Sequence, residues 1–338
     1  MEGGSLDHVR WLVSGQRLYG PPGLAHIPFI YTPLYYYVAA ALSCVFAPSL
    51  LLLRALSITF TGATALVLYL QLLHETRDRF AAWLGAALYV GTFRLSGYWF
   101  DIGRVDAACM FWLSLALYLA RCKRTDSSAA LAALALSLAF LTKQVALAAA
   151  VPLGWYLLCT QRSRAVAFTL GLLAAAGGGF LVLNWLHDGW LAYYTLRLPA
   201  QHALVWELLP DFWRKDLRRL APAGLLLMLC AWHNRKRPAA LLAFYAPLTA
   251  TLFAVSWAAR VHDGGAQNAI MPALLATSLA FGLAMHHGLV ASPDQDPPVL
   301  QPLAAYTLAL IQFVALLFAH PRAEARLDAV ASAQTSDS

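Results

Sequence analysis

Long apolar stretches with almost no charge recur along this chain and restrict what it can fold into. Examples are residues 50–73, 129–141 and 302–319. A bilayer accommodates such stretches as helices of about 20 residues, because a helix satisfies its own backbone hydrogen bonds. The chain is 60% hydrophobic and only 12% charged, whereas a soluble domain carries about 25% charged residues. The sequence therefore predicts an all-α polytopic membrane protein.

Hydropathy and helix breakers predict roughly ten transmembrane helices. The expected crossings are 50–74, 80–98, 106–120, 128–142, 145–160, 165–187, 220–233, 238–259, 268–288 and 301–319. A shorter apolar segment, 33–47, precedes them and is too short to cross comfortably. The two crossings that flank Lys143 are also compatible with one kinked or discontinuous helix.

The basic turns predict an orientation. They occur at every second loop and contain Arg77 and Arg79, then Arg121, Lys123 and Arg124, then Arg162 and Arg164, then Arg235, Lys236 and Arg237. The positive-inside rule places these turns in the cytoplasm. The net charge of +7 is spread over separate turns, so it predicts a bilayer partner and no nucleic acid. The high Ala and Leu content suggests a bacterial inner membrane.

A single transmembrane domain is expected over 1–320, followed by a polar tail, 321–338, whose composition is typical of disorder. Residues 1–49 are predicted to form an outer loop with amphipathic and re-entrant segments. Residues 188–219 combine tryptophans with charges of both signs, which is typical of an amphipathic helix in the interface. We expect this second segment to be an interfacial anchor instead of a catalytic element.

Ionisable residues near the outer ends of spans are candidates for chemistry, because charge at membrane depth is costly. Asp106 begins a predicted span, with Arg104 two residues earlier. It could serve as a helix N-cap beside an interfacial arginine, or it could act in catalysis. Lys143 lies between two apolar runs on the face that the positive-inside rule depletes of lysine. Either it extends to the head groups, or it binds a phosphate with Thr142 and Gln144 as donors.

The N-terminal stretch and a late outer loop supply further candidates. Glu2 and Asp7 lie near His8, and a carboxylate there could take the proton of an attacking hydroxyl; a solvated terminal helix is the plainer interpretation. In the loop 260–268, Gly264 and Gly265 permit close backbone approach to a ligand. That loop also carries Arg260, Asp263 and Asn268. The aromatic run 31–37, which includes Tyr35, fits an interfacial belt or a sugar or lipid groove.

The order of these features resembles the membrane-embedded glycosyltransferases of the GT-C class. The similarity is to the bacterial branch related to protein O-mannosyltransferases and the lipid A aminoarabinose transferase. The matching segments are the acidic stretch 2–19, Pro33-Leu-Tyr-Tyr36, Arg104-Val-Asp106, Leu141-Thr-Lys-Gln144, and Gly264-Gly265 with Asn268. In that branch a span precedes the first acidic loop, and the loop has Asp beside Glu. The resemblance therefore implies that this chain lacks the first span.

The resemblance implies a polyprenyl-phosphate-linked sugar as donor and transfer to a hydroxyl of a glycan, lipid or protein on the extracytoplasmic face. The same resemblance implies that catalysis involves Asp106 and an acid of the first loop, Glu2 or Asp7. Substrate binding is expected of Arg104, Lys143, Gln144, Tyr35, Arg260, Asp263 and Asn268. Participation of a divalent cation is left open. The alternatives are a transporter or lipid flippase, or an inactive truncated paralogue.

Overall fold

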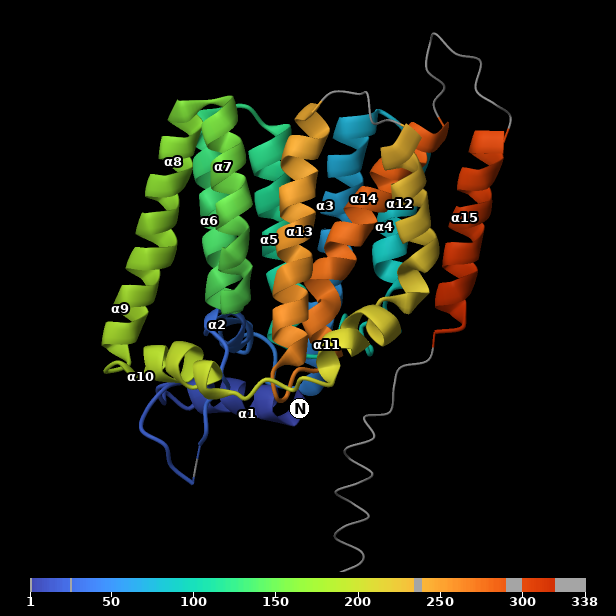
Figure 1. Cartoon of the computed structure of the whole chain (residues 1–338). Coiled ribbons are helices and arrows are strands. Elements are labelled where there is room, and N and C mark those ends of the chain that lie inside the picture. Colours follow the sequence, from blue (N-terminus) through green and yellow to red (C-terminus); the bar gives the residue numbers. More distant parts are fainter. Residues whose placement is uncertain (1, 25, 234–238, 290–299, 320–338) are drawn as a thin grey trace, which may run out of the picture.

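The computed structural model describes residues 2–24, 26–233, 239–289 and 300–319. Within these ranges the protein is a bundle of helices whose long members run side by side (Figure 1). The one bridge of β type in these ranges joins Leu204 and His262. The all-α prediction is therefore confirmed. The predicted tail, 321–338, lies outside the described residues.

Helices or continuous helical runs form at each of the ten predicted crossings. Their bounds are α3 Leu50–Thr76, α4 Arg79–Gly91, α5 Val105–Cys122, α6 Asp126–Thr142, η1 Gln144–Ala149 with α7 Ala150–Thr160, α8 Arg162–Leu172 with η2 Leu173–Gly178 and α9 Gly179–Leu186, α12 Ala221–His233, α13 Ala239–Val261, α14 Met271–Leu289 and α15 Leu300–Leu317. The chain reverses direction at Lys143, so α6 and α7 are two helices instead of one kinked helix (Figure 1).

Five of these helical stretches are long and apolar enough to cross a bilayer by length and composition. Three of the five, 50–76, 162–186 and 242–261, have at most 28% of their apolar window buried in the protein. Leu51, Leu181 and Val182 are among the exposed large hydrophobic residues. Soluble monomers rarely expose contiguous apolar faces of this extent, so these faces are lipid-facing and the protein is an integral membrane protein.

Helix α14 lies at the centre of the bundle, and 89% of its apolar window is buried. It packs closely on α4 through small residues. A Cβ added to Gly85 would lie 3.0 Å from the carbonyl oxygen of Ser278, and one added to Gly282 would lie 3.2 Å from that of Ala81. Small residues allow the two backbones to approach, and dispersion contacts then hold the helices together in lipid.

One end of the bundle is covered by short helices and loops (Figure 1). Helix α1 (Glu2–Val13) and helix α2 (Leu34–Leu42) pack against each other there. A buried cluster joins them to α3 and α5 through Val9, Tyr36, Leu53 and Val105. This cluster fixes the first loop against the start of α5, where the candidate residues lie.

Two predicted elements differ from the structure. The crossing predicted over 80–98 ends as helix α4 at Gly91, and turns follow to residue 103. Gly97 and Tyr98 have positive φ values of 68° and 66°, a conformation that α-helices exclude. The apolar sequence beyond Gly91 therefore packs as turns.

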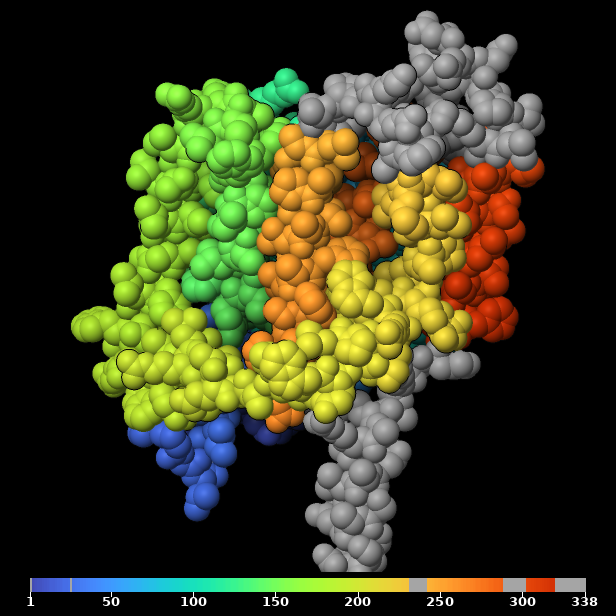
Figure 2. All heavy atoms as spheres, in the orientation of Figure 1, coloured from blue at the N-terminus to red at the C-terminus, as the bar shows by residue number. Residues whose placement is uncertain are grey.

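The segment predicted as one amphipathic helix, 188–219, forms two helical runs instead. The first run contains α10 (Trp190–Ala192), η3 (Tyr193–Arg197) and η4 (Pro199–Gln201), and the second contains α11 (Leu208–Asp211), η5 (Phe212–Asp216) and η6 (Arg218–Leu220). An irregular stretch around Leu204 separates them and pairs with His262. In Figure 2 this segment extends across the lower ends of the helices, in front of α13.

Candidate functional site

Three residues from three separate parts of the chain form a buried cluster around one carboxylate. Asp106 is the second residue of α5, Lys143 is the extended residue between α6 and η1, and Asn268 lies in η7 (Gln267–Ile270). The Nζ of Lys143 donates to Oδ1 of Asp106 at 2.7 Å, and the Nδ2 of Asn268 donates to the same oxygen at 2.9 Å. Asp106 is 2% exposed. These residues were expected on the same face, and the structure brings them into contact.

The second carboxylate oxygen of Asp106 has no partner. Its Oδ2 is buried and makes no hydrogen bond within the described residues. A buried polar atom without a partner costs roughly 1–3 kcal/mol of stability. Such an atom at the start of a helix, where the backbone dipole favours an anion, is free to accept a hydrogen bond from a bound hydroxyl.

Lys143 is held as a cation by its surroundings. Burial lowers the pKa of Lys143, but the charge of Asp106 and the hydrogen bond between the two outweigh this effect and raise the pKa above its ordinary value. Its ammonium also lies 5.5 Å from the ring centroid of Tyr31. The side chain therefore presents a positive charge within the protein instead of extending to the head groups.

Arg104 is a second buried cation, enclosed by aromatic rings. Its guanidinium carbon lies 5.0 Å, 5.2 Å and 5.1 Å from the ring centroids of Phe29, Tyr31 and Trp99. Arg104 is 5% exposed, and its Nε has no hydrogen-bond partner in the described part of the chain. Aromatic faces attract a cation, but they leave its charge uncompensated. The ring of Tyr31 is thus shared by two cations, Arg104 and Lys143, and Lys143 also contacts Asp106.

Glu2 supports this site from α1. Its carboxylate accepts from the Nε of Arg54 at 2.9 Å and from the backbone N–H of Gly103, also at 2.9 Å. A second bond joins Oε2 to the Nη2 of Arg54 at 2.5 Å. The hydrogen bonds from Arg54 lower the pKa of Glu2. Glu2 thus holds the turn that precedes Arg104, whereas Asp7 is exposed on the same helix.

Gln144 and Tyr35 occupy structural positions around the cluster. The Nε2 of Gln144 donates to the carbonyl oxygens of Ile30 at 2.8 Å and Thr195 at 3.0 Å, and its buried Oε1 lacks a partner in the described residues. Gln144 therefore ties the first loop to η3. Tyr35 is buried in the cluster that joins α1 and α2, and its hydroxyl donates to the carbonyl of Leu53 at 3.3 Å.

The late outer loop is divided between two environments. Asn268 reaches Asp106, as described above. Arg260 instead pairs with Asp216 at 2.9 Å, and its Nη1 donates to the carbonyl of Gly265 at 2.5 Å. Asp263 lies exposed at the tip of the loop. Gly265 is needed for this fold, because an added Cβ would lie 2.6 Å from two backbone oxygens.

The sequence did not single out the partners of these residues. Arg54 lies in the apolar run 50–73 and gave no sign of a role, although a lone arginine in such a run is itself unusual. Phe29 and Trp99 were not selected, and Tyr31 was noted only as part of an aromatic run. Asp216 was one charge among many in the interfacial segment.

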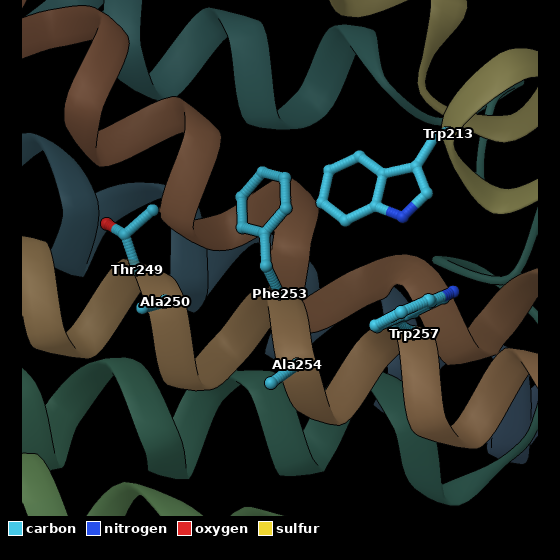
Figure 3. A pocket seen from close by; sticks show the side chains of 6 residues that line it. All are labelled: Trp213, Thr249, Ala250, Phe253, Ala254 and Trp257. Atoms are coloured by element: carbon cyan, nitrogen blue, oxygen red, sulfur yellow. The ribbon is translucent and has the colours of Figure 1, made fainter. Parts of the chain in front are cut away.

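A separate hollow of about 370 Å³ lies between η5 and α13. Figure 3 shows Trp213 facing Phe253 and Trp257 across it. The Trp257 indole N–H donates to the carbonyl of Leu209 at 3.1 Å, which leaves the hollow with aromatic and aliphatic walls apart from Thr249. It provides contact for apolar groups but no ionisable side chain.

The described residues contain no group of three or more His, Cys, Asp or Glu side chains placed to hold a metal ion. Asp106 has a lysine and an amide as its nearest partners instead of a second carboxylate.

The fold and the buried site define a polytopic α-helical membrane protein. Among solved structures it is similar to ArnT from Cupriavidus metallidurans. In complex with undecaprenyl phosphate, that protein matches with a TM-score of 0.61 and 13% identity over 93% of this chain and 71% of that one. Its apo state matches with a TM-score of 0.62 and 16% identity over 94% and 71%. No protein-family model and no curated protein matches the sequence.

Proposed function

We propose that this protein is a glycosyltransferase that moves a sugar from a polyprenyl-phosphate-linked donor to an acceptor hydroxyl at the extracytoplasmic face of the membrane. The observation that carries the proposal is the buried Asp106, with one free carboxylate oxygen, beside the two cations Lys143 and Arg104. The structurally similar ArnT binds undecaprenyl phosphate, which supports a lipid phosphate as the anionic part of the donor.

Asp106 is proposed as the group that receives the proton. The acceptor oxygen attacks the anomeric carbon, a new carbon–oxygen bond forms, and the hydroxyl proton passes to Oδ2 of Asp106. Hydrogen bonds from Lys143 and Asn268 to Oδ1 hold the carboxylate in place. Glu2 is less suited to this role, since Arg54 and Gly103 already engage its oxygens and its pKa is lowered.

Lys143 and Arg104 are proposed to bind the phosphate. The bond between the anomeric carbon and the phosphate oxygen breaks, and its electron pair stays on the polyprenyl phosphate. Preorganised cations in a site shielded from water stabilise such developing charge strongly. Arg104 has an uncompensated charge, and Lys143 has ammonium protons beyond the one directed at Asp106.

Glu2, Gln144 and Tyr35 are proposed to hold the site residues in place without contacting the substrates. Glu2 holds Gly103, next to Arg104, and Gln144 ties the first loop to η3. Tyr35 supports the buried cluster beneath α1. Arg260 is proposed to hold the late loop in place through Asp216 and the Gly265 carbonyl. Asp7 and Asp263, which are exposed on α1 and in the late loop, are proposed to face the acceptor or the head groups.

The test is sugar transfer in proteoliposomes supplied with a panel of polyprenyl-phosphate sugars, with and without a metal chelator. Asp106→Asn removes the proton acceptor and Lys143→Ala removes a phosphate ligand, so each is expected to lower transfer by at least about a hundredfold. The matched controls are Asp211→Asn and Lys215→Ala, which break an i,i+4 ion pair at the same end of the bundle. Both controls should retain transfer within about twofold, because such pairs contribute little.

If the folded wild-type protein transfers no sugar from any donor, the glycosyltransferase proposal is wrong. In that case the transporter or flippase alternative is tested in the same vesicles by movement of the lipid between leaflets. Full activity of Asp106→Asn would overturn the assigned role of Asp106 alone. Loss of transfer with the chelator, restored by a divalent cation, would add a metal to the reaction.

A further inference from the structure

A second cationic pocket lies at the opposite end of the bundle from Asp106. Its volume is about 460 Å³, within the range of ligand-binding pockets. It is formed where α5 ends, where α7 meets α8, and where α13 begins. The rise of α5 between Asp106 and Arg121 is about 22 Å, so this pocket is separate from the proposed transfer site.

Three arginines line this pocket, and no carboxylate is among its lining residues. Arg121 is neutralised by Glu75, with nitrogen–oxygen distances of 2.6 Å and 3.1 Å. Arg124 is exposed and Arg164 is buried, and neither forms an ion pair with a carboxylate in the described part of the chain. Among the described residues, Arg121 is thus the one lining arginine that is paired with a carboxylate within 4 Å, and the pocket lining is net positive.

Arg164 is only partly explained by a structural role. Its Nη2 donates to the carbonyls of Ala120 at 2.6 Å and Lys123 at 2.7 Å, and so caps the end of α5. Its Nε is buried and has no partner among the described residues. A capping role could be met by a neutral donor, whereas a buried arginine with an unused N–H is suited to an anion.

The start of α8 adds donors at the same place. The N-cap residue Gln161 lines the pocket, and its side chain makes no capping hydrogen bond. The first amides of a helix have no partner within the helix, and together with the helix dipole they favour a phosphate. The mouth of the pocket has Trp155, which is 62% exposed. Exposed indoles at the end of a span are typical of the lipid interface.

We propose that this pocket binds the phosphate of an anionic phospholipid in the leaflet opposite the transfer site. Arg124, Arg164 and the first amides of α8 would contact the phosphate, and Trp155 would lie against the glycerol and upper acyl chain. Basic pockets between helices on the cytoplasmic side are a recurrent way of binding anionic head groups. Because the site is remote from Asp106, the proposal stands whether or not the protein transfers sugar.

The test measures binding of phosphatidylglycerol to the purified full-length protein by native mass spectrometry and by thermal shift in neutral detergent. Phosphatidylcholine and inorganic phosphate are the comparison ligands. Arg124→Gln should weaken phosphatidylglycerol binding at least fivefold, and Arg162→Gln is its control. Arg162 is exposed and lies in the neighbouring basic turn at the start of α8, where Ser163 bonds Asp126. Its replacement removes the same charge, but Arg162 does not line the pocket. Its variant should bind within about twofold of the wild type.

If both variants lose phosphatidylglycerol binding equally, general surface charge attracts the lipid. That result would overturn the proposed binding in the pocket. Equal stabilisation by phosphatidylcholine, or by inorganic phosphate at the same concentration, would overturn the anionic-lipid assignment. A fluorescence measurement gives an independent check: brominated phosphatidylglycerol should quench the wild type more than Trp155→Phe. Identical quenching in the two proteins would contradict the proposed position of the lipid.

Discussion

At the scale of single residues, the site contains a buried arginine, Arg104, with no carboxylate partner among the described residues. Arg104 is buried among three aromatic rings, and its Nε makes no hydrogen bond with the described residues. A buried charge without a counterion lowers stability, and cation–π contacts recover only part of that loss. Positions where stability is given up in this way are frequently functional. The arginine is therefore expected to matter more for binding than for folding.

Replacing Arg104 with methionine tests this directly. Methionine fits an aromatic pocket and has no charge to desolvate, so the melting temperature without ligand should stay the same or rise. Affinity for undecaprenyl phosphate should fall at least tenfold, about 1.4 kcal/mol, measured as ligand-induced thermal shift in detergent. Arg10→Met, on the exposed face of α1, is the control and should change neither quantity. A clear drop in the ligand-free melting temperature, with binding intact, would make Arg104 a structural residue.

The sequence predicted which residues share the outer end of the bundle but not which of them touch. Hydropathy and basic turns indicate depth in the membrane, and on that basis Asp106, Lys143 and Asn268 were expected on one face. Lateral neighbours depend on how helices pack, which single-sequence patterns do not specify. Arg260 was grouped with the same site, yet it pairs with Asp216, 44 residues earlier in the chain.

At the scale of elements, one neutral histidine joins helix α1 to the first loop. The Nδ1 of His8 donates to the carbonyl of Gly4 at 2.6 Å, and its Nε2 accepts the backbone N–H of Phe29 at 2.8 Å. The second bond requires the neutral ring, because a protonated Nε2 has no lone pair to accept the Phe29 N–H. Burial, together with the nearby His26, lowers the pKa of His8 to about 4. A proton added to Nε2 would oppose the Phe29 N–H and loosen α1, which also carries Glu2.

The sign of the pH effect follows from this shift. The folded-state pKa of His8 lies below its ordinary value of 6.5, so the unfolded chain binds the proton first as pH falls. Its stabilising effect is complete above about pH 6.5 and is lost between pH 6.5 and 4, with a total of roughly 3 kcal/mol. The stabilising effect of the Glu2 pair is complete above the ordinary pKa of 4.5 and is lost only below that pH, so it does not change in this interval.

We expect the melting temperature of the wild-type protein to fall more between pH 7.5 and 5 than that of His8→Asn. Asparagine can keep a donor and an acceptor but does not titrate. His74→Asn, an exposed position on α3, is the matched control and should behave like the wild type. If His8→Asn shows the full pH dependence, another group is responsible.

Element boundaries were predicted least well where the chain leaves the membrane. The apolar sequence predicts helix to residue 98, but α4 ends at Gly91, and the turns that follow include positive φ values at Gly97 and Tyr98. The charged segment 188–219 forms two runs because Leu204 pairs with His262 of a distant loop. In both cases tertiary contacts, which local composition does not contain, determine the outcome.

At the scale of the whole molecule, the two ends of the bundle have different chemistry. One end has Asp106 with its cations under α1, and the other has the arginine turns and the second pocket. The positive-inside rule assigns the arginine end to the cytoplasm. Both proposals depend on this assignment, because a lipid-linked sugar and an inner-leaflet phospholipid are met at opposite surfaces.

Cysteine labelling in cells tests the orientation. In a variant without the five native cysteines, Asp263→Cys marks the site end and Ser127→Cys marks the arginine end; both positions are exposed. A membrane-impermeant maleimide should label Asp263→Cys in intact spheroplasts, and Ser127→Cys only after permeabilisation. The reverse pattern would place Asp106 at the cytoplasmic surface. Transfer at the extracytoplasmic face would then be excluded even if the purified protein were active, because Asp106, Lys143 and Arg104 could meet only a donor presented from the cytoplasm.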